Sequence, residues 1–295
     1  MAVLIDPPQW PARGTLFSHL VSDASLEELH EFADRLGAHP RAFDQDHYDI
    51  PQELHSPAVA LGALAVSGTE LVRRLIASGL RLSGAARRAQ TTTRVSTLRQ
   101  HWATVLPQAP AVGEELLERW GDRSRRYHDQ RHLLEVLEAL GSAQVAHPSR
   151  ALRLAAWFHD AIYEGRPGQD ESDSAELAIV ALSAHVPVAE IDEVTRLVLL
   201  TAGHHVEHSD HDGIALCDAD LAILGADPGR YDAYARDVRA EYSEVPVDLF
   251  RQGRALVLDD FLTRERLYVG DVAHAKWDSP ARANLSREVH RLRSG

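Results

Sequence analysis

A histidine and an aspartate, His159 and Asp160, lie inside one of the most apolar segments of the sequence, residues 152–162 (LRLAAWFHDAI). Because the segment is apolar nearly all round, it predicts a central, buried helix. A carboxylate buried there is costly unless a partner compensates its charge. That partner could be a metal ion, an arginine, or a hydrogen bond at a helix end. His128 and His132, one helical turn apart, precede an apolar stripe that directs His132 toward the core.

Further histidines and aspartates favour the metal ion. The apolar face of a helix expected over Ile191–Thr201 leads directly into His204 and His205 at its C-terminal end. Asp218 and Asp220 lie beside another apolar run. Asp218 could equally be a helix N-cap, whereas Asp220 lies inside the helix pattern and is harder to explain that way.

The elements that must position these residues are helices. From about residue 97 helical patterns dominate, and we expect an all-α domain over residues 97–295. Prolines at 148, 187, 228, 246 and 280 fall between the expected helices, as starts or stops should. Those helices are Glu114–Trp120, His132–Leu140, Ala151–Tyr163, Asp173–His185, Ile191–Thr201, Tyr231–Tyr242, Asp248–Thr263 and Ala281–Leu292.

Residues 1–81 form a separate unit in which strand and helix patterns alternate, and they predict a small α/β domain. The apolar run Ala2–Ile5 is typical of a buried strand that a Pro-Pro pair ends. Ser25 and Glu28 form a capping box, so a helix should begin there and end before Gly37.

Two more elements and a linker complete this expectation. The apolar stretch Ala58–Val66 suggests a strand, and Thr69 should cap a further helix. Residues 82–96 are polar, small and basic with little apolar periodicity, which indicates a linker. The predicted fold class is therefore mainly α, with an all-helical domain preceded by a small α/β domain.

The order of the candidate ligands resembles the signature of the HD superfamily of metal-dependent phosphohydrolases, which is His, then His-Asp, then a distant Asp. The surrounding motifs resemble a bacterial subfamily of predicted HD phosphohydrolases, and the likeness covers about residues 97–292. These motifs are RYHDQRH at 126–132, WFHDAIY at 157–163, DE at 170–171, Thr201 with His204, DADL at 218–221, LG at 224–225, GR at 253–254 and NL at 284–285.

The resemblance implies an all-helical HD-type domain with a divalent metal site. The ligands that it implies are His132, His159, Asp160 and Asp220, with His204 and Asp218 as candidates for further ligands. The cofactor would be Mn, Mg, Fe, Co, Ni or Zn, as one ion, or as two if Asp160 bridges them and His204 or His205 joins the site. Such a cation would acidify a bound water and neutralise phosphoryl oxygens.

The activity so implied is hydrolysis of a phosphate ester of a small metabolite, with a nucleotide suggested by superfamily analogy alone. The alternative is a metal-stabilised binding or signalling module without turnover. Asp160, His128 and Arg131 are the candidate catalytic residues. His128 could be a general acid or only a packing residue. Arg131, like Arg254 and Arg282, could hold phosphate or simply pair with an acid.

The N-terminal residues 1–81 resemble a small bacterial domain of unknown function. The matching text is VLID at 3–6, WP at 10–11, HLVSD at 19–23, HYD at 47–49 and GLR at 79–81. Asp6, His19, His47 and Asp49 could assemble a polar or metal site at strand ends. Turn chemistry and local hydrogen bonding are the alternative.

Composition limits the partners. The net charge of −13 argues against binding to nucleic acid or to an anionic membrane, because both need a basic surface. The one cysteine, Cys217, excludes an internal disulfide framework and favours a reducing cytoplasm. The N-terminal residues do not have the pattern of a signal peptide, and no apolar run is long enough for a transmembrane helix. We therefore expect a small phosphorylated substrate as the partner, and the oligomeric state stays open.

Overall fold

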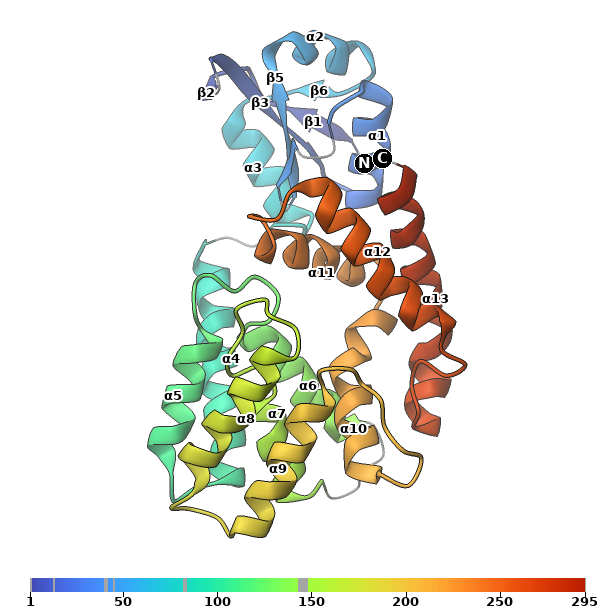
Figure 1. Cartoon of the computed structure of the whole chain (residues 1–295). Helices are drawn as coiled ribbons and strands as arrows, with labels where there is room; N and C mark the ends of the chain where they lie inside the picture. The colour runs from blue at the N-terminus through green and yellow to red at the C-terminus, as the bar shows by residue number, and fades with distance from the viewer. Residues whose placement is uncertain are drawn as a thin grey trace. The chain divides into compact units, whose positions relative to one another are not determined.

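The computed structural model describes residues 2–12, 14–39, 42–44, 46–81, 84–142 and 148–294. The chain divides into two compact units, Met1–Thr91 and Thr92–Gly295. The boundary falls within one long helix, α4 (Gly84–Val105). As predicted, the chain is mainly helical, and the strands in the described residues all belong to the N-terminal unit (Figure 1).

The N-terminal unit is built on a small mixed sheet with the strand order β4-β5-β3-β1-β6, and β2 pairs with β3. Strands β1 and β6 run parallel, and the other pairs are antiparallel. The strands are β1 (Val3–Ile5), β2 (Trp10–Ala12), β3 (Thr15–Ser22), β4 (Phe43–Asp44), β5 (His47–Pro51) and β6 (Leu64–Ala65), and the helices are α1 (Leu26–Leu36), α2 (Gln52–Ala60) and α3 (Gly68–Ala77).

Helices cover both faces of this sheet. Because side chains alternate across a strand, Leu20 of β3 packs into a cluster with residues of α1 and α2, such as Leu29, while the next residue, Val21, packs on Leu75 of α3. The small α/β domain predicted for this region is therefore present.

Local signals in the N-terminal unit were partly correct. Ser25 caps α1 and Gly37 ends it with a φ of 73°, as predicted. The strand expected over Ala58–Val66 is wrong for most of its length, since α2 extends to Ala60 and only Leu64–Ala65 pair with β1. Ser67, and not Thr69, caps α3, because the Ser67 side chain accepts the N–H of Glu70.

The segment 82–96, expected as a linker, is helical from Gly84 onward as the first part of α4. Leu82 and Ser83 lie outside the described residues. Alanine, glutamine and arginine are good helix formers, so this stretch needs little apolar periodicity to be helical. Burial begins further along the same helix, at Leu98 and Trp102.

The C-terminal unit consists of helices around one continuous apolar core. Its central element is α7, which packs against α6, α8, α9 and α10 (Figure 1). Besides α4, the helices are α5 (Pro110–Trp120), α6 (Gln130–Ser142), α7 (Arg150–Phe158), α8 (Gln169–Leu182), α9 (Val188–Leu200), α10 (His211–Asp220), the 3₁₀ helix η2 (Leu221–Gly225), α11 (Pro228–Glu241), α12 (Val247–Thr263) and α13 (Asp271–Ser294).

The prolines behave mostly as predicted. Pro187 and Pro246 are the N-caps of α9 and α12, and Pro228 begins α11. Pro280 is the exception, because it lies inside α13. A proline there removes one backbone hydrogen bond, a cost that tertiary packing of the helix offsets, and Trp277 and Ala281 on either side are buried.

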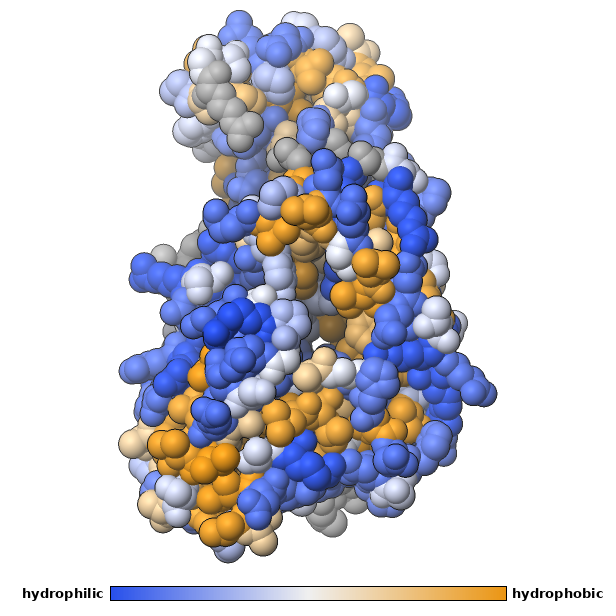
Figure 2. Space-filling view, viewed as in Figure 1, coloured by the Kyte–Doolittle hydropathy of each residue, from blue (hydrophilic) through white to orange (hydrophobic). Residues whose placement is uncertain are grey.

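The surface of the C-terminal unit is mostly hydrophilic, with apolar side chains exposed over α8 and α9 (Figure 2). These side chains are Ile179, Val180, Val188 and Leu199. In the part of the chain that the structure describes, no helix combines the length and apolar character that crossing a membrane requires.

Candidate metal centre

Helix α7 delivers His159 and Asp160 to the interior of the C-terminal unit. Its side chains from Leu154 to Phe158 are all buried, as the apolar segment predicted. The helix ends at Phe158, however, and not at Tyr163 as expected, so His159 is its C-cap and Asp160 lies in the following turn. The buried residues continue past the helix end, which is why the apolar pattern overstated its length.

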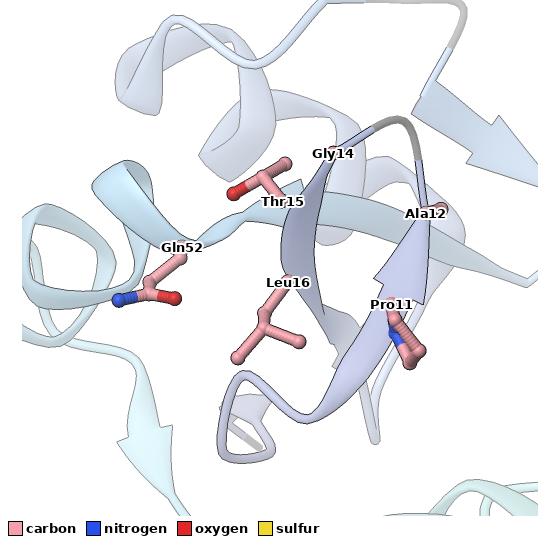
Figure 3. Close-up of a pocket in the computed structure, with 6 residues that line it drawn as sticks. All are labelled: Pro11, Ala12, Gly14, Thr15, Leu16 and Gln52. Carbon is pink, nitrogen blue, oxygen red and sulfur yellow. The ribbon is translucent and has the colours of Figure 1, made fainter.

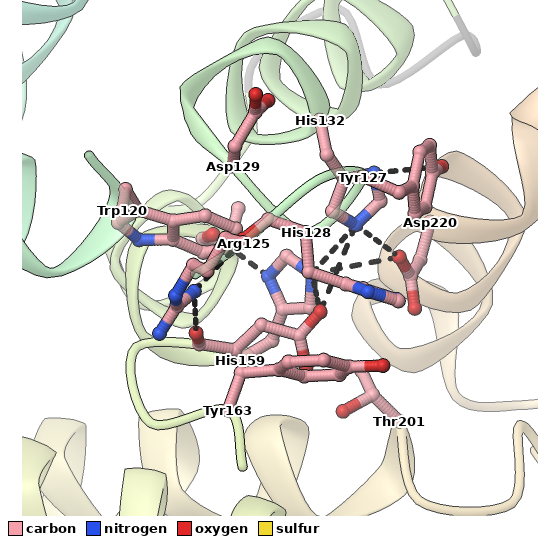
Figure 4. A network of polar contacts seen from close by, with 12 residues as sticks. Trp120, Arg125, Tyr127, His128, Asp129, His132, His159, Tyr163, Thr201 and Asp220 are labelled. Carbon is pink, nitrogen blue, oxygen red and sulfur yellow. Dashed lines mark hydrogen bonds and ion pairs between the residues drawn. The ribbon is translucent and has the colours of Figure 1, made fainter. Parts of the chain in front are cut away.

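Three of the predicted ligands, His132, His159 and Asp220, converge in Figure 4, and their ligand atoms all lie within 4.8 Å of one another. The carboxylate of Asp160 lies beside them. The Nε2 atom of His132 lies 3.2 Å from Nε2 of His159 and 3.0 Å from Oδ1 of Asp220. The same oxygen of Asp220 is 3.4 Å from Nε2 of His159. Oδ2 of Asp160 lies 3.4 Å from Nε2 of His159 and 3.8 Å from Nε2 of His132. This cluster, His132, His159, Asp160 and Asp220, is called the helical cluster below.

Each of the two imidazole rings has a hydrogen-bond partner at Nδ1, on the side away from the cluster. Nδ1 of His159 lies 2.9 Å from the carbonyl oxygen of Ala156, which can only accept, so Nδ1 carries a proton and Nε2 is the ring atom that faces the cluster. Nδ1 of His132 lies 2.9 Å from the hydroxyl of Tyr127. Such contacts fix the orientation of metal-binding histidines in proteins.

The electrostatics of the helical cluster require a positive charge. Burial alone would lower the pKa of His159, but Asp160 and Asp220 raise it to about 9. Burial would raise the pKa of Asp220, but the neighbouring histidines hold it well below its usual range. The C-terminal ends of α7 and α10 add their partial negative charge at the same place. A proton or a metal cation satisfies this demand.

An arginine does not fill that role. Among the described residues, no arginine forms an ion pair with the carboxylate of Asp160, whose partners are His132 and His159. The guanidinium group of Arg125 donates instead to the carbonyl oxygens of Asp160 (2.7 Å), Ala161 (2.9 Å) and His128 (2.9 Å). Arg125 therefore ties the turn after α7 to the loop before α6. Nothing in the sequence pattern pointed to this residue.

His204 extends the cluster on the side of Asp220. Its Nε2 lies 2.7 Å from the second carboxylate oxygen of Asp220, Oδ2. Its φ of 53° is the one positive value among the described non-glycine residues, and such strain is common where function fixes a side chain. Arg264 holds this loop by donating to the carbonyl oxygens of Gly203 (3.1 Å) and His204 (3.4 Å). His205 is exposed.

Asp218, a candidate for a further ligand, is engaged outside the helical cluster. Its carboxylate accepts the backbone N–H groups of Val269 (3.0 Å) and Gly270 (2.8 Å), in the turn before α13. Burial raises its pKa to about 6. The N-cap alternative is wrong, because Asp210 caps α10. The preceding residue, Cys217, is buried in the same helix, and burial raises the pKa of its thiol.

His128 lies beside the helical cluster but not on α6, which begins only at Gln130. The expected shared helix face with His132 is therefore wrong, although the two ring centroids are 5.6 Å apart. His128 stacks on Tyr163, with centroids 4.0 Å apart, and its Nδ1 lies 2.7 Å from Oε2 of Glu241.

Glu241 organises the loop before α6. Its Oε1 accepts the backbone N–H groups of Arg126, Tyr127 and His128 at 2.8 to 2.9 Å. Burial would raise the pKa of Glu241, but the hydrogen bonds from His128 and these N–H groups lower it to about 2. Tyr127 belongs to the RYHDQRH motif, and Glu241 lies far from that motif in the sequence. No local pattern assigned either to the ring nitrogen of a histidine.

The three arginines considered for phosphate binding are all engaged with acids. Arg131 forms ion pairs with Asp129 (3.0 Å) and Asp237 (3.1 Å). Arg254 pairs with Glu288 at 3.0 Å, and Arg282 with Asp278 at 2.7 Å. These contacts match the alternative interpretation, in which the arginines support the fold.

A second group of candidate ligands lies in the N-terminal unit. His19, His47 and Asp49 each offer one ligand atom, and these atoms all lie within 4.8 Å of one another. Among the residues that the structure describes, two clusters of histidine and aspartate could therefore hold a metal ion.

A concavity of about 620 Å³ lies at the β2–β3 hairpin (Figure 3). No residue of either cluster lines it. It is lined by Pro11, Ala12, Gly14, Thr15, Leu16 and Gln52. None of these six side chains ionises, so this surface offers no group for acid–base or metal chemistry.

Comparison with known proteins is informative for the N-terminal unit. No curated protein and no solved structure matched the chain. The resemblance to HD phosphohydrolases over residues 97–292 therefore stays a prediction. The resemblance over residues 1–81 is confirmed: residues 3–78 match the model of a family described as "Protein of unknown function (DUF4031)".

Proposed function

We propose that the C-terminal unit is a metal-dependent phosphohydrolase of the HD type that hydrolyses a phosphate ester of a small metabolite, such as a nucleotide. The observation that supports this most is the helical cluster, in which two imidazole Nε2 atoms and two carboxylates from three separate parts of the chain converge. This donor set suits a divalent ion and leaves coordination positions open. The order of the residues in the sequence supports the same reading.

The residues around the cluster have distinct tasks in this proposal. A divalent ion bound there would acidify a coordinated water and neutralise charge on the phosphoryl group. Tyr127 and the carbonyl group of Ala156 hold the two imidazoles in position. Asp160 has a partly exposed carboxylate with no arginine partner, so it can orient the attacking water as well as bind the ion.

His128 is suited to proton transfer. Glu241 engages its Nδ1, so Nε2 is the ring atom left to exchange a proton with a leaving group. The stacking on Tyr163 fixes the ring plane. Because all three candidate arginines are paired with acids, the cation would carry most of the phosphate binding.

Phosphate release from the full chain tests this function. The protein is stripped with a chelator, reloaded with Mn²⁺, and assayed on a panel of phosphomonoesters and nucleotides. We expect turnover that depends on the ion and that Asp160→Asn abolishes. Asp192→Asn, a matched change at an exposed aspartate on α9, should leave turnover intact. Equal turnover in Asp160→Asn would reject the proposal. Metal binding without phosphate release from any substrate would favour the module without turnover.

A further inference from the structure

We propose that the N-terminal unit binds a divalent transition metal ion of its own through His19, His47 and Asp49. The sheet places these residues on one face. His19 of β3 and Asp49 of β5 are register partners, and His47 lies two residues before Asp49 on the same strand. Since side chains alternate along a strand and partners share a face, all three must point the same way. The ring centroids of His19 and His47 are 5.0 Å apart.

His19 is oriented by a buried carboxylate. Asp6, which follows β1 and is 1% exposed, lies with Oδ2 at 2.9 Å from Nδ1 of His19. The other oxygen of Asp6 accepts the backbone N–H of His19 at 2.6 Å, and Trp10 donates its indole N–H to Oδ2 at 3.2 Å. A carboxylate only accepts, so Nδ1 of His19 carries the proton and Nε2 is left as the ligand atom.

His47 repeats this arrangement with a different acid. Its Nδ1 lies 3.0 Å from Oδ1 of Asp46, and Asp46 is in turn held by Arg81, whose Nε donates to Oδ2 at 2.7 Å. Nη2 of Arg81 is also near Nδ1 of His47, at 3.3 Å. The shorter contact to the ionised acceptor places the proton on Nδ1, so Nε2 again faces away from its support.

Both free Nε2 atoms then approach the same oxygen. Oδ1 of Asp49 lies 3.9 Å from Nε2 of His19 and 3.6 Å from Nε2 of His47. Ligands bonded to one zinc-like ion at about 2.0–2.2 Å lie at comparable distances from each other. Two histidines and one carboxylate, with each imidazole backed by an acid, are typical of sites that keep a position open for water or substrate.

Hydrogen bonding within the sheet explains only half of this geometry. Structural roles account for the Nδ1 atoms of both histidines, through Asp6 and Asp46. These roles do not explain why Nε2 of both rings and the carboxylate of Asp49, which is 49% exposed, are directed at a shared point. Three donor atoms of types that favour zinc, cobalt or iron therefore converge on a rigid sheet with access from solvent.

Metal content of the full chain tests this site. The helical cluster is first disabled by Asp220→Ala, so that any remaining ion is independent of the proposed phosphohydrolase site. Zn²⁺ bound per chain is measured by equilibrium dialysis and elemental analysis, and Co²⁺ binding by visible absorption. We expect one equivalent in this background and its loss on adding His47→Ala. Adding His39→Ala instead, at an exposed histidine of the same unit, should retain it.

Two outcomes would overturn the proposal. One is the absence of bound Zn²⁺ and Co²⁺ in the Asp220→Ala background, and the other is unchanged binding after His47→Ala. If His47→Ala does not fold, as judged by circular dichroism, Asp49→Asn replaces it. That side chain is half exposed and keeps its size, so the sheet should tolerate it, and the bound equivalent should still be lost.

Discussion

The two histidine–aspartate clusters use the same ligand types on different supports. In the N-terminal unit, two adjacent strands present His19, His47 and Asp49, and the histidine side chains are 28% and 14% exposed. In the C-terminal unit, helix ends and turns present the ligands, and His132 and His159 are 2% and 0% exposed. One cluster therefore lies on the surface of a sheet, and the other lies within a core.

The position of negative charge differs as well. Behind the N-terminal imidazoles lie the carboxylates of Asp6 and Asp46, whereas a neutral hydroxyl and a carbonyl lie behind the C-terminal ones. In the helical cluster the charge is inside, on Asp160 and Asp220. An acid behind an imidazole makes it a stronger ligand, while an acid among the ligands can also act on a substrate. The N-terminal cluster has a single acid among its ligands, Asp49, so its charge lies mostly behind the imidazoles, whereas the helical cluster has two acids facing the shared point.

The largest expected effect is that of Asp220→Ala on the helical cluster. This change removes the carboxylate that lies closer to Nε2 of His132, at 3.0 Å, against 3.8 Å for that of Asp160. We expect loss of the ion from this cluster and a fall in phosphate release of more than about 100-fold, beyond the 10–100-fold typical of residues that act only through a ligand. Elemental analysis and the phosphate assay measure both. Retention of turnover would remove the functional contrast between the clusters.

Glu241→Gln is expected to change the pH dependence of stability. The pKa of Glu241 is lowered in the folded chain from 4.5 to about 2, so its contribution is complete above pH 4.5 and is lost as the pH falls toward 2. By linkage, that contribution is about 3 kcal/mol. Urea unfolding followed by tryptophan fluorescence should show this slope in the unmodified chain and not in Glu241→Gln. An identical slope in both would exclude Glu241 as the support of the loop before α6.

Substitutions of the residues that contact Nδ1 of the histidines compare a neutral partner with a charged one. Tyr127→Phe removes the partner of His132, and Asp6→Asn removes the charged partner of His19. Both should weaken metal binding by roughly 10–100-fold, with Asp6→Asn near the upper end because a charge is lost. Competition with a chromophoric chelator measures each affinity. If Tyr127→Phe had the larger effect, the assignment of the stronger support to the N-terminal cluster would be wrong.

The smallest effect is expected for His204→Ala. Within the cluster, the ring of His204 contacts Asp220 alone, through Oδ2, so its loss should leave the number of bound ions unchanged and lower affinity by about 10-fold or less. His205→Ala, at the exposed neighbour, is the control. A drop of one ion per chain in His204→Ala alone would instead make His204 a ligand in a two-ion centre.

The sequence predicted elements best where a cap and an apolar pattern coincide. Ser25 and Gly37 marked the ends of α1 correctly, and the apolar segment around Trp157 predicted a buried helix. Helix α4 was missed because its first half has no apolar stripe to reveal it. The end of α7 was misplaced because burial continues through the turn that holds Asp160. Burial and helical geometry are separate properties, and the pattern reports only burial.

The direction of individual side chains limited how much of the site could be predicted from the sequence. Asp218 and Asp220 are two residues apart on one helix, so they point to nearly opposite sides of it, about 160° apart. One reaches the histidines and the other reaches the turn before α13, and only tertiary packing decides which. Arg131 is turned from His132 by about 100° for the same reason, and it meets Asp237 instead. In the sheet, the sequence named His19, His47 and Asp49 as candidates for one site, but the face that they share follows from the strand register.

The burial of Cys217 has a practical consequence. The thiol lies in α10, three residues before Asp220, and is shielded from solvent. Alkylating reagents need a thiolate that they can reach, so they should modify this chain only while α10 is locally open. Because the chain has no other cysteine, the rate of alkylation reports how often α10, the helix that carries the proposed ligand Asp220, opens locally. An ion bound by Asp220 should lower this rate.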